Sequence, residues 1–392
     1  MTVDCYSNRV PGARIRRPGR FPRALVRNII PALAVLILAG AALGGCQSLR
    51  LGSSEAELAL EDIAAGARPS RLKQRTPAPV RRTIDYRVDG RPHAADEYLS
   101  PAGVRAGIIL VPGVAVTGKD DPRLMAFATS LARLGFAVLV PDIASLRRLQ
   151  IRAHNVGEVV DAFRYLASRP ELADRVGIAG FSYGAGPVLL ASLQPAISEQ
   201  VRFVVSIGGY FDLRRLVAYL TTGRYPQAAA QRLPAPHPYT RRVLARSNAA
   251  LLQQPGDRQF LEALADRRVS IEQAPPDLGA DARAVLRLLE NREPSRVQPL
   301  IDALPDAIRA ELDGLNPARA DLSRAKAKYL LLHGRHDNLV PYLESLALAD
   351  RLPAGHAELF LIDGLIHMDL APKRHDIPRL IEALQALLAQ RD

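Results

Sequence analysis

From residue 81 onwards, short apolar runs alternate with stretches whose apolar residues recur at helical spacing. Two extended runs, 83–88 and 91–99, flank Asp89-Gly90, which predicts a β-hairpin with a tight turn. Further apolar runs predict buried strands at residues 107–111, 136–140, 175–179, 201–206, 328–332 and 358–362. Because amphipathic helices separate most of these runs, the pattern indicates a parallel sheet covered by helices on both faces.

The predicted helices fall into two groups. The first group alternates with the strands, at residues 122–134 and 156–168, from Gly184 onwards, and at 378–390. The second group follows Phe211, where the strand pattern stops, with helical stretches at about 213–222, 240–253, 257–267, 280–291 and 295–313. Pro305 is expected to break or kink the last stretch. We therefore predict a core in two parts, 81–211 and 323–392, with residues 212–322 inserted as a helical cap.

The N-terminal segment carries much of the positive charge. The chain has a formal charge of +12, and residues 1–45 contribute +6 of it through seven Arg and one Asp. An uncharged, mainly apolar run from Ile29 to Gly45 follows these arginines and ends at Cys46. A basic region, an apolar region and small residues before a cleavage point are typical of an export signal. We therefore expect residues 1–45 to be a signal peptide.

The segment Leu43-Gly44-Gly45-Cys46 resembles the lipobox of a bacterial lipoprotein signal. The resemblance implies cleavage before Cys46 and attachment of lipid to its thiol. The protein would then be anchored in the cell envelope on the periplasmic side, at the outer membrane. The alternative is an uncleaved membrane anchor, because the apolar run is close to the shortest that spans a bilayer.

Residues 46–80 are expected to form a lipid-anchored tether with one short helix. Ser54 and Glu57 have the spacing of a capping box, which predicts a helix to about Ala65. Prolines with Arg and Lys between them follow, and this composition is typical of an extended, solvated linker.

Composition excludes several classes of function. The charge outside residues 1–45 is spread over a long chain without a dense basic block interleaved with aromatics, so we expect no nucleic-acid partner. Cys5 and Cys46 are the two cysteines, and Cys5 precedes the predicted cleavage point. The mature body would therefore have no disulfide, thiolate-ligated zinc or cysteine nucleophile. No His-Glu-x-x-His or comparable cluster suggests a metal, and no cofactor is expected.

Residues Gly180-Phe181-Ser182-Tyr183-Gly184 fit the pattern Gly-x-Ser-x-Gly. They follow a predicted strand directly and open a predicted helix, which is the setting that a nucleophile elbow requires. Side chains at Gly180 and Gly184 would collide with neighbouring backbone in so tight a turn. The alternative is a serine in an ordinary strand–helix loop, but the context favours Ser182 as a nucleophile.

With this elbow, residues 81–392 resemble the α/β-hydrolase superfamily, and most of all its dienelactone-hydrolase and acyl-peptidase-like branch. The resemblance implies a mostly parallel eight-stranded sheet and a triad in the chain order Ser, acid, His. Asp337 matches the family's acid segment, in which Gly precedes the Asp and Val-Pro follows it. His367 follows the last predicted strand in a Gly-x-x-His loop. The predicted catalytic triad is therefore Ser182, Asp337 and His367.

Each member of this triad has an alternative. Asp337 could cap a helix instead, because Asp is favoured at such positions. Asp363 is the rival acid, but it lies too close to the histidine loop to match the family pattern. His333 and His336 are expected to be structural neighbours of the acid turn.

The resemblance also implies two backbone donors for an oxyanion. One is the N–H of Tyr183, at the start of the helix that follows the nucleophile. The other is the N–H of Val114, in the loop after the first central strand, with Ala115 as the fallback. Pro112 departs from the His-Gly that the family often has there, but a backbone donor does not depend on that side chain.

These residues favour a serine hydrolase that cleaves carboxylic esters or related acyl bonds of a small molecule through an acyl-Ser182 intermediate. A peptidase of the same fold is the nearest alternative. A non-catalytic scaffold protein of the envelope belongs to a different class, and the triad argues against it because a scaffold needs none of the three residues.

The lipobox makes Cys46→Ser a direct test of the anchor. Wild-type protein from its native membrane is expected to begin at Cys46 and to carry lipid on that residue. Cys46→Ser should block this processing and accumulate as a precursor of higher mass in the membrane fraction. Intact-mass spectrometry of both proteins makes the measurement, and an unmodified Cys46 within an intact N-terminus would indicate the plain membrane anchor instead.

Overall fold

The computed structural model describes residues 54–225, 233–367 and 369–392. The predicted signal peptide and Cys46 lie outside these residues. Residues Ser53–Asp392 form one compact unit. Across the described segments, no helix combines the length and the apolar character needed to cross a bilayer.

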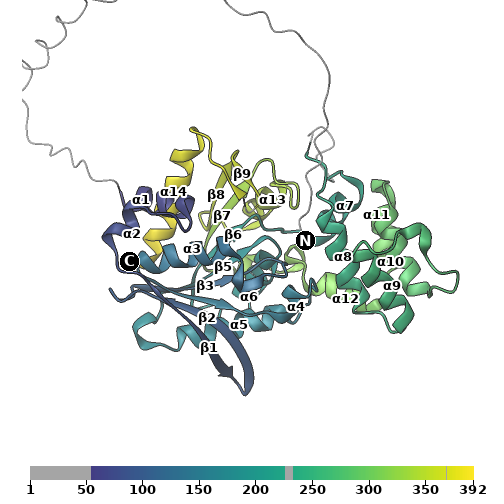
Figure 1. Cartoon of the computed structure of the whole chain (residues 1–392), viewed down its shortest axis with the longest axis horizontal. Coiled ribbons are helices and arrows are strands. Elements are labelled where there is room, and N and C mark those ends of the chain that lie inside the picture. The colour runs from purple at the N-terminus through teal and green to yellow at the C-terminus, as the bar shows by residue number, and fades with distance from the viewer. Residues whose placement is uncertain (1–53, 226–232, 368) are drawn as a thin grey trace, which may run out of the picture. The chain divides into compact units, whose positions relative to one another are not determined.

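Eight strands form one sheet in the order β1-β2-β4-β3-β5-β6-β7-β8 (Figure 1). β2 runs antiparallel to β1 and β4, and every other pair in this sheet is parallel. The structure therefore confirms the predicted mostly parallel eight-stranded sheet. The strands are β1 (Val80–Val88), β2 (Arg91–Leu99), β3 (Ala106–Val111), β4 (Phe136–Pro141), β5 (Val176–Phe181), β6 (Val201–Ile207), β7 (Lys328–Gly334) and β8 (Ala357–Ile362).

The predicted hairpin is formed by β1 and β2. Its turn residues, Asp89 and Gly90, have φ angles of +49° and +80°. Positive φ at both central residues matches the right-handed twist of the flanking strands, which explains why this dipeptide closes the hairpin. Val88 pairs with Arg91 directly across the turn.

Helices cover both faces of the sheet because successive strand residues point in opposite directions. In β3, Ile108 and Leu110 face one layer, whereas Ile109 and Val111 face the other, and all four are fully buried. The first layer contains α1 (Glu55–Ala65), α2 (Arg71–Arg75), α3 (Pro122–Arg133) and α14 (Asp376–Leu388). The second contains α4 (Ala144–Arg147), α5 (Asn155–Ala167), α6 (Ala185–Ser192) and α13 (Leu343–Arg351).

The segment assigned to a tether packs against the core. α1 begins with the expected capping box, since the N–H of Glu57 donates to Ser54 Oγ and the N–H of Ser54 donates to Glu57 Oε2. Ala56 and Leu60 of α1 are buried in the layer that α3 and α14 form. The short helix expected in this segment therefore packs on the core, because the apolar stripe of α1 meets helices that are distant in the sequence.

Between β6 and β7 the described residues form helices without a strand. The cap, residues 212–322, contains α7 (Leu213–Thr222), α8 (Tyr239–Ala249), α9 (Pro255–Ala265), α10 (Ala280–Glu290), α11 (Val297–Asp302) and α12 (Asp306–Gly314). Pro305 separates α11 from α12, as the sequence predicted. Figure 1 shows these helices as a group beside the sheet.

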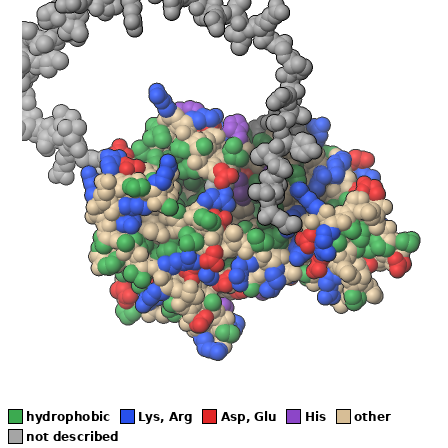
Figure 2. All heavy atoms as spheres, in the orientation of Figure 1, with side chains coloured by type: hydrophobic (Ala, Val, Ile, Leu, Met, Phe, Trp, Pro, Cys, Tyr) green, Lys and Arg blue, Asp and Glu red, His purple; other side chains and the backbone are tan. Residues whose placement is uncertain are grey.

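Charged side chains are interleaved on the surface of the protein. Figure 2 shows Lys and Arg beside Asp and Glu over the visible face. Several of them form exposed ion pairs between elements, such as Arg164 with Asp89. Because such exposed pairs are screened by solvent, each contributes little to stability.

The first turn of α13 ties the entry of the cap to the core. Glu344 is fully buried, and its Oε2 accepts the N–H groups of Phe211 at 2.8 Å and Asp212 at 2.6 Å. Burial raises the pKa of Glu344 from its ordinary value of 4.5 to about 7, although the two backbone donors favour the carboxylate. The folded chain therefore keeps this proton over a pH range in which the unfolded chain releases it.

This difference in pKa makes stability depend on pH. The free energy of unfolding is expected to fall as the pH rises from about 4.5 to about 7, because the unfolded state gains by releasing the proton in that window. Glu344→Gln removes the titration but keeps an oxygen for both backbone donors, so it should flatten this part of the profile. Thermal melts across the window measure the effect. Glu199→Gln, at an exposed carboxylate, is the control, and a Glu344→Gln profile as steep as that of the control would contradict the assignment.

Candidate active site

β5 delivers Ser182 to the carboxyl end of the parallel strands. Ser182 has a φ of +52°, in the left-handed region that residues other than glycine rarely adopt. Residues Ser182–Gly184 form a single 3-10 turn that leads directly into α6. This strained strand–turn–helix connection has the geometry of a nucleophile elbow.

Gly180 and Gly184 permit this turn because a larger residue would not fit. A Cβ at Gly180 would lie 2.5 Å from backbone atoms of the following turn, and a Cβ at Gly184 would lie 2.5 Å from the carbonyl oxygen of Pro112. The second approach presses the start of α6 against the end of β3. The loop after β3 consequently lies beside Ser182, since a Cβ at Gly113 would stand 3.2 Å from Ser182 Cβ.

Asp337 lies in the loop that follows β7 and is buried. Its Oδ1 accepts the N–H groups of Leu339 at 2.8 Å and Val340 at 3.0 Å. Its Oδ2 lies 2.9 Å from Nδ1 of His367. The backbone therefore fixes one carboxylate oxygen and leaves the other to orient the imidazole, which is the arrangement that a triad acid requires.

A second imidazole lies beside this carboxylate, as the sequence suggested. His333 in β7 is fully buried, with Nδ1 2.7 Å from Ser345 Oγ and Nε2 2.9 Å from the carbonyl oxygen of Val340. Its Nε2 is also 3.6 Å from Asp337 Oδ2. Burial by itself raises the pKa of Asp337, but His333 and His367 outweigh that effect and hold the pKa well below its ordinary value. Asp337 is therefore a carboxylate near neutral pH.

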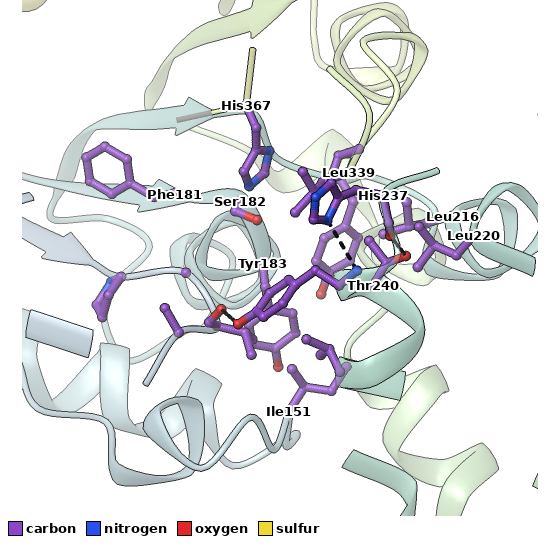
Figure 3. Close-up of a pocket in the computed structure, with 18 of the residues that line it drawn as sticks. Ile151, Phe181, Ser182, Tyr183, Leu216, Leu220, His237, Thr240, Leu339 and His367 are labelled. Carbon is purple, nitrogen blue, oxygen red and sulfur yellow. Dashed lines mark hydrogen bonds between the residues drawn. The ribbon is translucent and has the colours of Figure 1, made fainter. Parts of the chain in front are cut away.

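His367 lies between two short paired strands, β9 (Leu365–Ile366) and β10 (Asp369–Leu370). Its side chain is 13% exposed, and it lines the same cavity as Ser182. Figure 3 shows the imidazole pointing toward Ser182. The structure thus places the predicted serine and histidine at one cavity, with Asp337 bonded to the histidine from behind.

The cavity around Ser182 has a volume of about 470 Å³. Loops that follow β3, β5 and β7 form its floor, and the cap forms one of its walls (Figure 3). Most of that wall is apolar and comes from α7 and α8, through Leu213, Leu216, Val217, Leu220, Val243 and Leu244, and His237, Tyr239 and Thr240 add polar groups to it. The volume suits a small organic ligand, and the apolar wall favours one that buries hydrocarbon.

The cap also holds the loops on both sides of Ser182. The hydroxyl of Tyr239 donates to the carbonyl oxygen of Val114 at 2.8 Å, and the N–H of His237 donates to the carbonyl oxygen of Asn338 at 2.9 Å. Val114 and Tyr183, the predicted oxyanion donors, both line the cavity. Their role as donors stays a prediction.

The rival acid has other partners. Asp363 Oδ2 lies 3.0 Å from Nε2 of His375, and with Asp376 these residues bring three potential metal ligands within 4.8 Å of one another. However, Asp376 already accepts three backbone N–H groups, from Asp363, Gly364 and Lys373. We therefore interpret this cluster as a structural cap at the start of α14.

Sequence reasoning missed three residues that complete the site. Tyr239 and His237 act through loops that are far away in the sequence, so no local motif marks them. Gly208, at the end of β6, has a φ of +60°, and a Cβ there would lie 3.3 Å from Asp337 Oδ2. A glycine directly after a parallel strand was the signal that could have identified this position, because catalytic loops gather there.

No family model and no curated protein matches this sequence. Similar solved structures include a 2,6-dihydroxy-pseudo-oxynicotine hydrolase, with 17% identity, 80% of this chain and 68% of that chain covered, and a TM-score of 0.45. A dienelactone hydrolase from Anabaena variabilis shares 16% identity over 80% of this chain and 97% of its own, with a TM-score of 0.43. Est1E from Butyrivibrio proteoclasticus, solved with ferulic acid, shares 15% identity over 78% of this chain and 98% of its own, with a TM-score of 0.44.

Identities below 20% and TM-scores below 0.5 do not by themselves assign a fold or a function to this chain. The assignment of the fold therefore rests on the chain itself. Its strand order, its helices on both faces of the sheet and its sharp turn at Ser182 are those of the α/β-hydrolase fold, with a helical cap inserted between β6 and β7.

Proposed function

We propose that this protein is a serine hydrolase that cleaves carboxylic esters, or related acyl bonds, of small apolar substrates. The observation that carries the proposal is the 2.9 Å contact between Asp337 and His367, with His367 and a strained Ser182 facing one apolar cavity. A serine is activated when an imidazole can take the proton of its hydroxyl and a buried carboxylate orients that imidazole.

In the proposed mechanism, His367 Nε2 takes the proton of Ser182 Oγ while Oγ attacks the carbonyl carbon of the ester. The oxyanion that forms accepts hydrogen bonds from the backbone N–H groups of Tyr183 and Val114. His367 then gives the proton to the departing alcohol, which leaves an acyl-Ser182. Water, deprotonated by His367, attacks the acyl group, and the returned proton regenerates Ser182 as the acid departs. Throughout, Asp337 holds the tautomer with hydrogen on Nδ1 and stabilises the imidazolium.

Two alternatives to an esterase are a peptidase of the same fold and a non-catalytic envelope protein. A peptidase would use the same residues on an amide. A catalytically inactive envelope protein would not need the strain at Ser182, which costs free energy. We further propose that lipid on Cys46 anchors the enzyme in the bacterial cell envelope, on the basis of the lipobox alone.

Ser182→Ala is expected to leave the protein folded and to lower the turnover of p-nitrophenyl esters about 10³- to 10⁶-fold, because the nucleophile is lost. The variant should also lose labelling by a fluorophosphonate probe. Ser168→Ala, at an exposed serine, is the matched control and should keep both signals. Near wild-type turnover by folded Ser182→Ala would mean that another residue is the nucleophile.

Tyr239→Phe tests whether the cap orients the oxyanion loop. The change removes the hydrogen bond to the Val114 carbonyl, so kcat should fall about two- to tenfold, the worth of one hydrogen bond, with a smaller change in KM. Tyr219→Phe is the control, since that hydroxyl donates to Pro234 within the cap. Equal effects of the two substitutions on kcat would assign Tyr239 to cap stability alone.

A further inference from the structure

A second cavity lies in the helical layer on one face of the sheet. Its volume is about 860 Å³, and its walls come from α1, α3 and α14 together with residues of β6, β7 and β8 beneath them. Most residues that face it are apolar. They include Leu60 of α1, Phe127 of α3, Val205 and Phe360 of the sheet, and Ala383 and Leu384 of α14.

Polar groups at the wall of this cavity are already paired. Asp62 accepts from Ser130 Oγ at 2.6 Å and from Lys73 Nζ at 2.5 Å. Arg123 Nη1 lies 2.6 Å from Asp369 Oδ1. Since these groups satisfy one another, the cavity suits a ligand without polar groups of its own.

The second cavity adjoins the cavity of Ser182. Arg123, Leu124, Phe181 and Asp369 line both of them. Phe181 directly precedes the nucleophile, and its ring packs edge-on against Phe127, with ring centroids 5.7 Å apart. In Figure 3, Phe181 lies on the opposite side of Ser182 from the cap residues Leu216 and Leu220. An ester at Ser182 therefore has an apolar space on each side.

We infer that this second cavity binds a long, unbranched hydrocarbon chain of the ester substrate, which makes the preferred substrates lipid esters. The inference rests on the proposed function, because it needs the scissile bond at Ser182. The hydrocarbon chain of the substrate enters past Phe181 and the Arg123–Asp369 pair, and runs between α3 and α14 toward α1. The cavity around Ser182 receives the other substituent of the ester.

The dimensions of the cavity agree with such a chain. A methylene group occupies about as much space as a water molecule in the liquid, roughly 30 Å³, so a chain of 16 carbons needs roughly 480 Å³. The cavity, at about 860 Å³, exceeds this volume. A short acyl chain would leave most of the apolar wall uncovered, so affinity should grow with chain length.

Filling the cavity tests the inference. Ala383 of α14 lines it, whereas Ala386 of the same helix packs in the same layer without lining it, and both are partly buried. Full-length protein with Ala383→Phe or Ala386→Phe is assayed on two ester series. One series varies the acyl chain of p-nitrophenyl esters from butyrate to palmitate, and the other varies the alcohol chain of acetate esters.

In at least one series, Ala383→Phe is expected to lower kcat/KM for the longest ester at least tenfold and to leave the shortest within twofold. Ala386→Phe should keep the wild-type dependence on chain length. Equal losses at all chain lengths with Ala383→Phe, or no loss in either series, would overturn the inference while the proposed function stands.

A binding assay separates the two proposals. Ser182→Ala protein is titrated with cis-parinaric acid, a fluorescent fatty acid, with and without Ala383→Phe, and the second substitution should weaken binding at least tenfold. If no ester is hydrolysed, the proposed function is wrong, and the hydrocarbon chain cannot then be part of a substrate. If the fatty acid binds only after Cys46→Ser, the lipid on Cys46 fills the cavity, and the inference is overturned.

Discussion

The close approach of α6 to the end of β3 is the constraint on which the site depends. Gly184 stands where any Cβ would meet the carbonyl oxygen of Pro112, and Gly180 stands where one would meet the backbone of the next turn. Between these two glycines Ser182 adopts a left-handed conformation, with a φ of +52°. The same close approach brings the loop after β3 beside Ser182. One steric requirement thus positions both the predicted nucleophile and the loop that carries a predicted oxyanion donor.

The acid and the histidine depend on hydrogen bonds in the interior. Asp337 is buried, and its charge is tolerated because two backbone N–H groups and the His367 ring surround it. His333 adds a second imidazole from beneath and is itself held by Ser345 and Val340. A carboxylate fixed in this way does not need to reorganise when the imidazole gains a proton, so electrostatic stabilisation is already in place.

The cap is bound to the core through the loops that carry the site. Tyr239 bonds to the loop after β3, and His237 bonds to the loop of Asp337. Ser247 of α8 accepts the N–H of Ile151 at 2.8 Å, and Glu344 holds the chain where it enters the cap. Since α7 and α8 also line the Ser182 cavity, a change in how the cap docks would alter both the shape of the cavity and the positions of the loops that carry Val114 and Asn338.

The sequence alone predicted the strands, the hairpin and the sharp turn at Ser182, because periodicity, turn dipeptides and glycine spacing are local properties. Pro305 likewise marked the break between α11 and α12. The docking of α1 on α14, the bonds from Tyr239 and His237, and the second cavity beside Phe181 were decided by the tertiary structure. Each of these features joins residues that are far apart in the chain. An apolar stripe or a hydroxyl in the sequence shows that a partner is needed, but it does not show which residue that partner is. Only the folded arrangement of the layers supplies that partner.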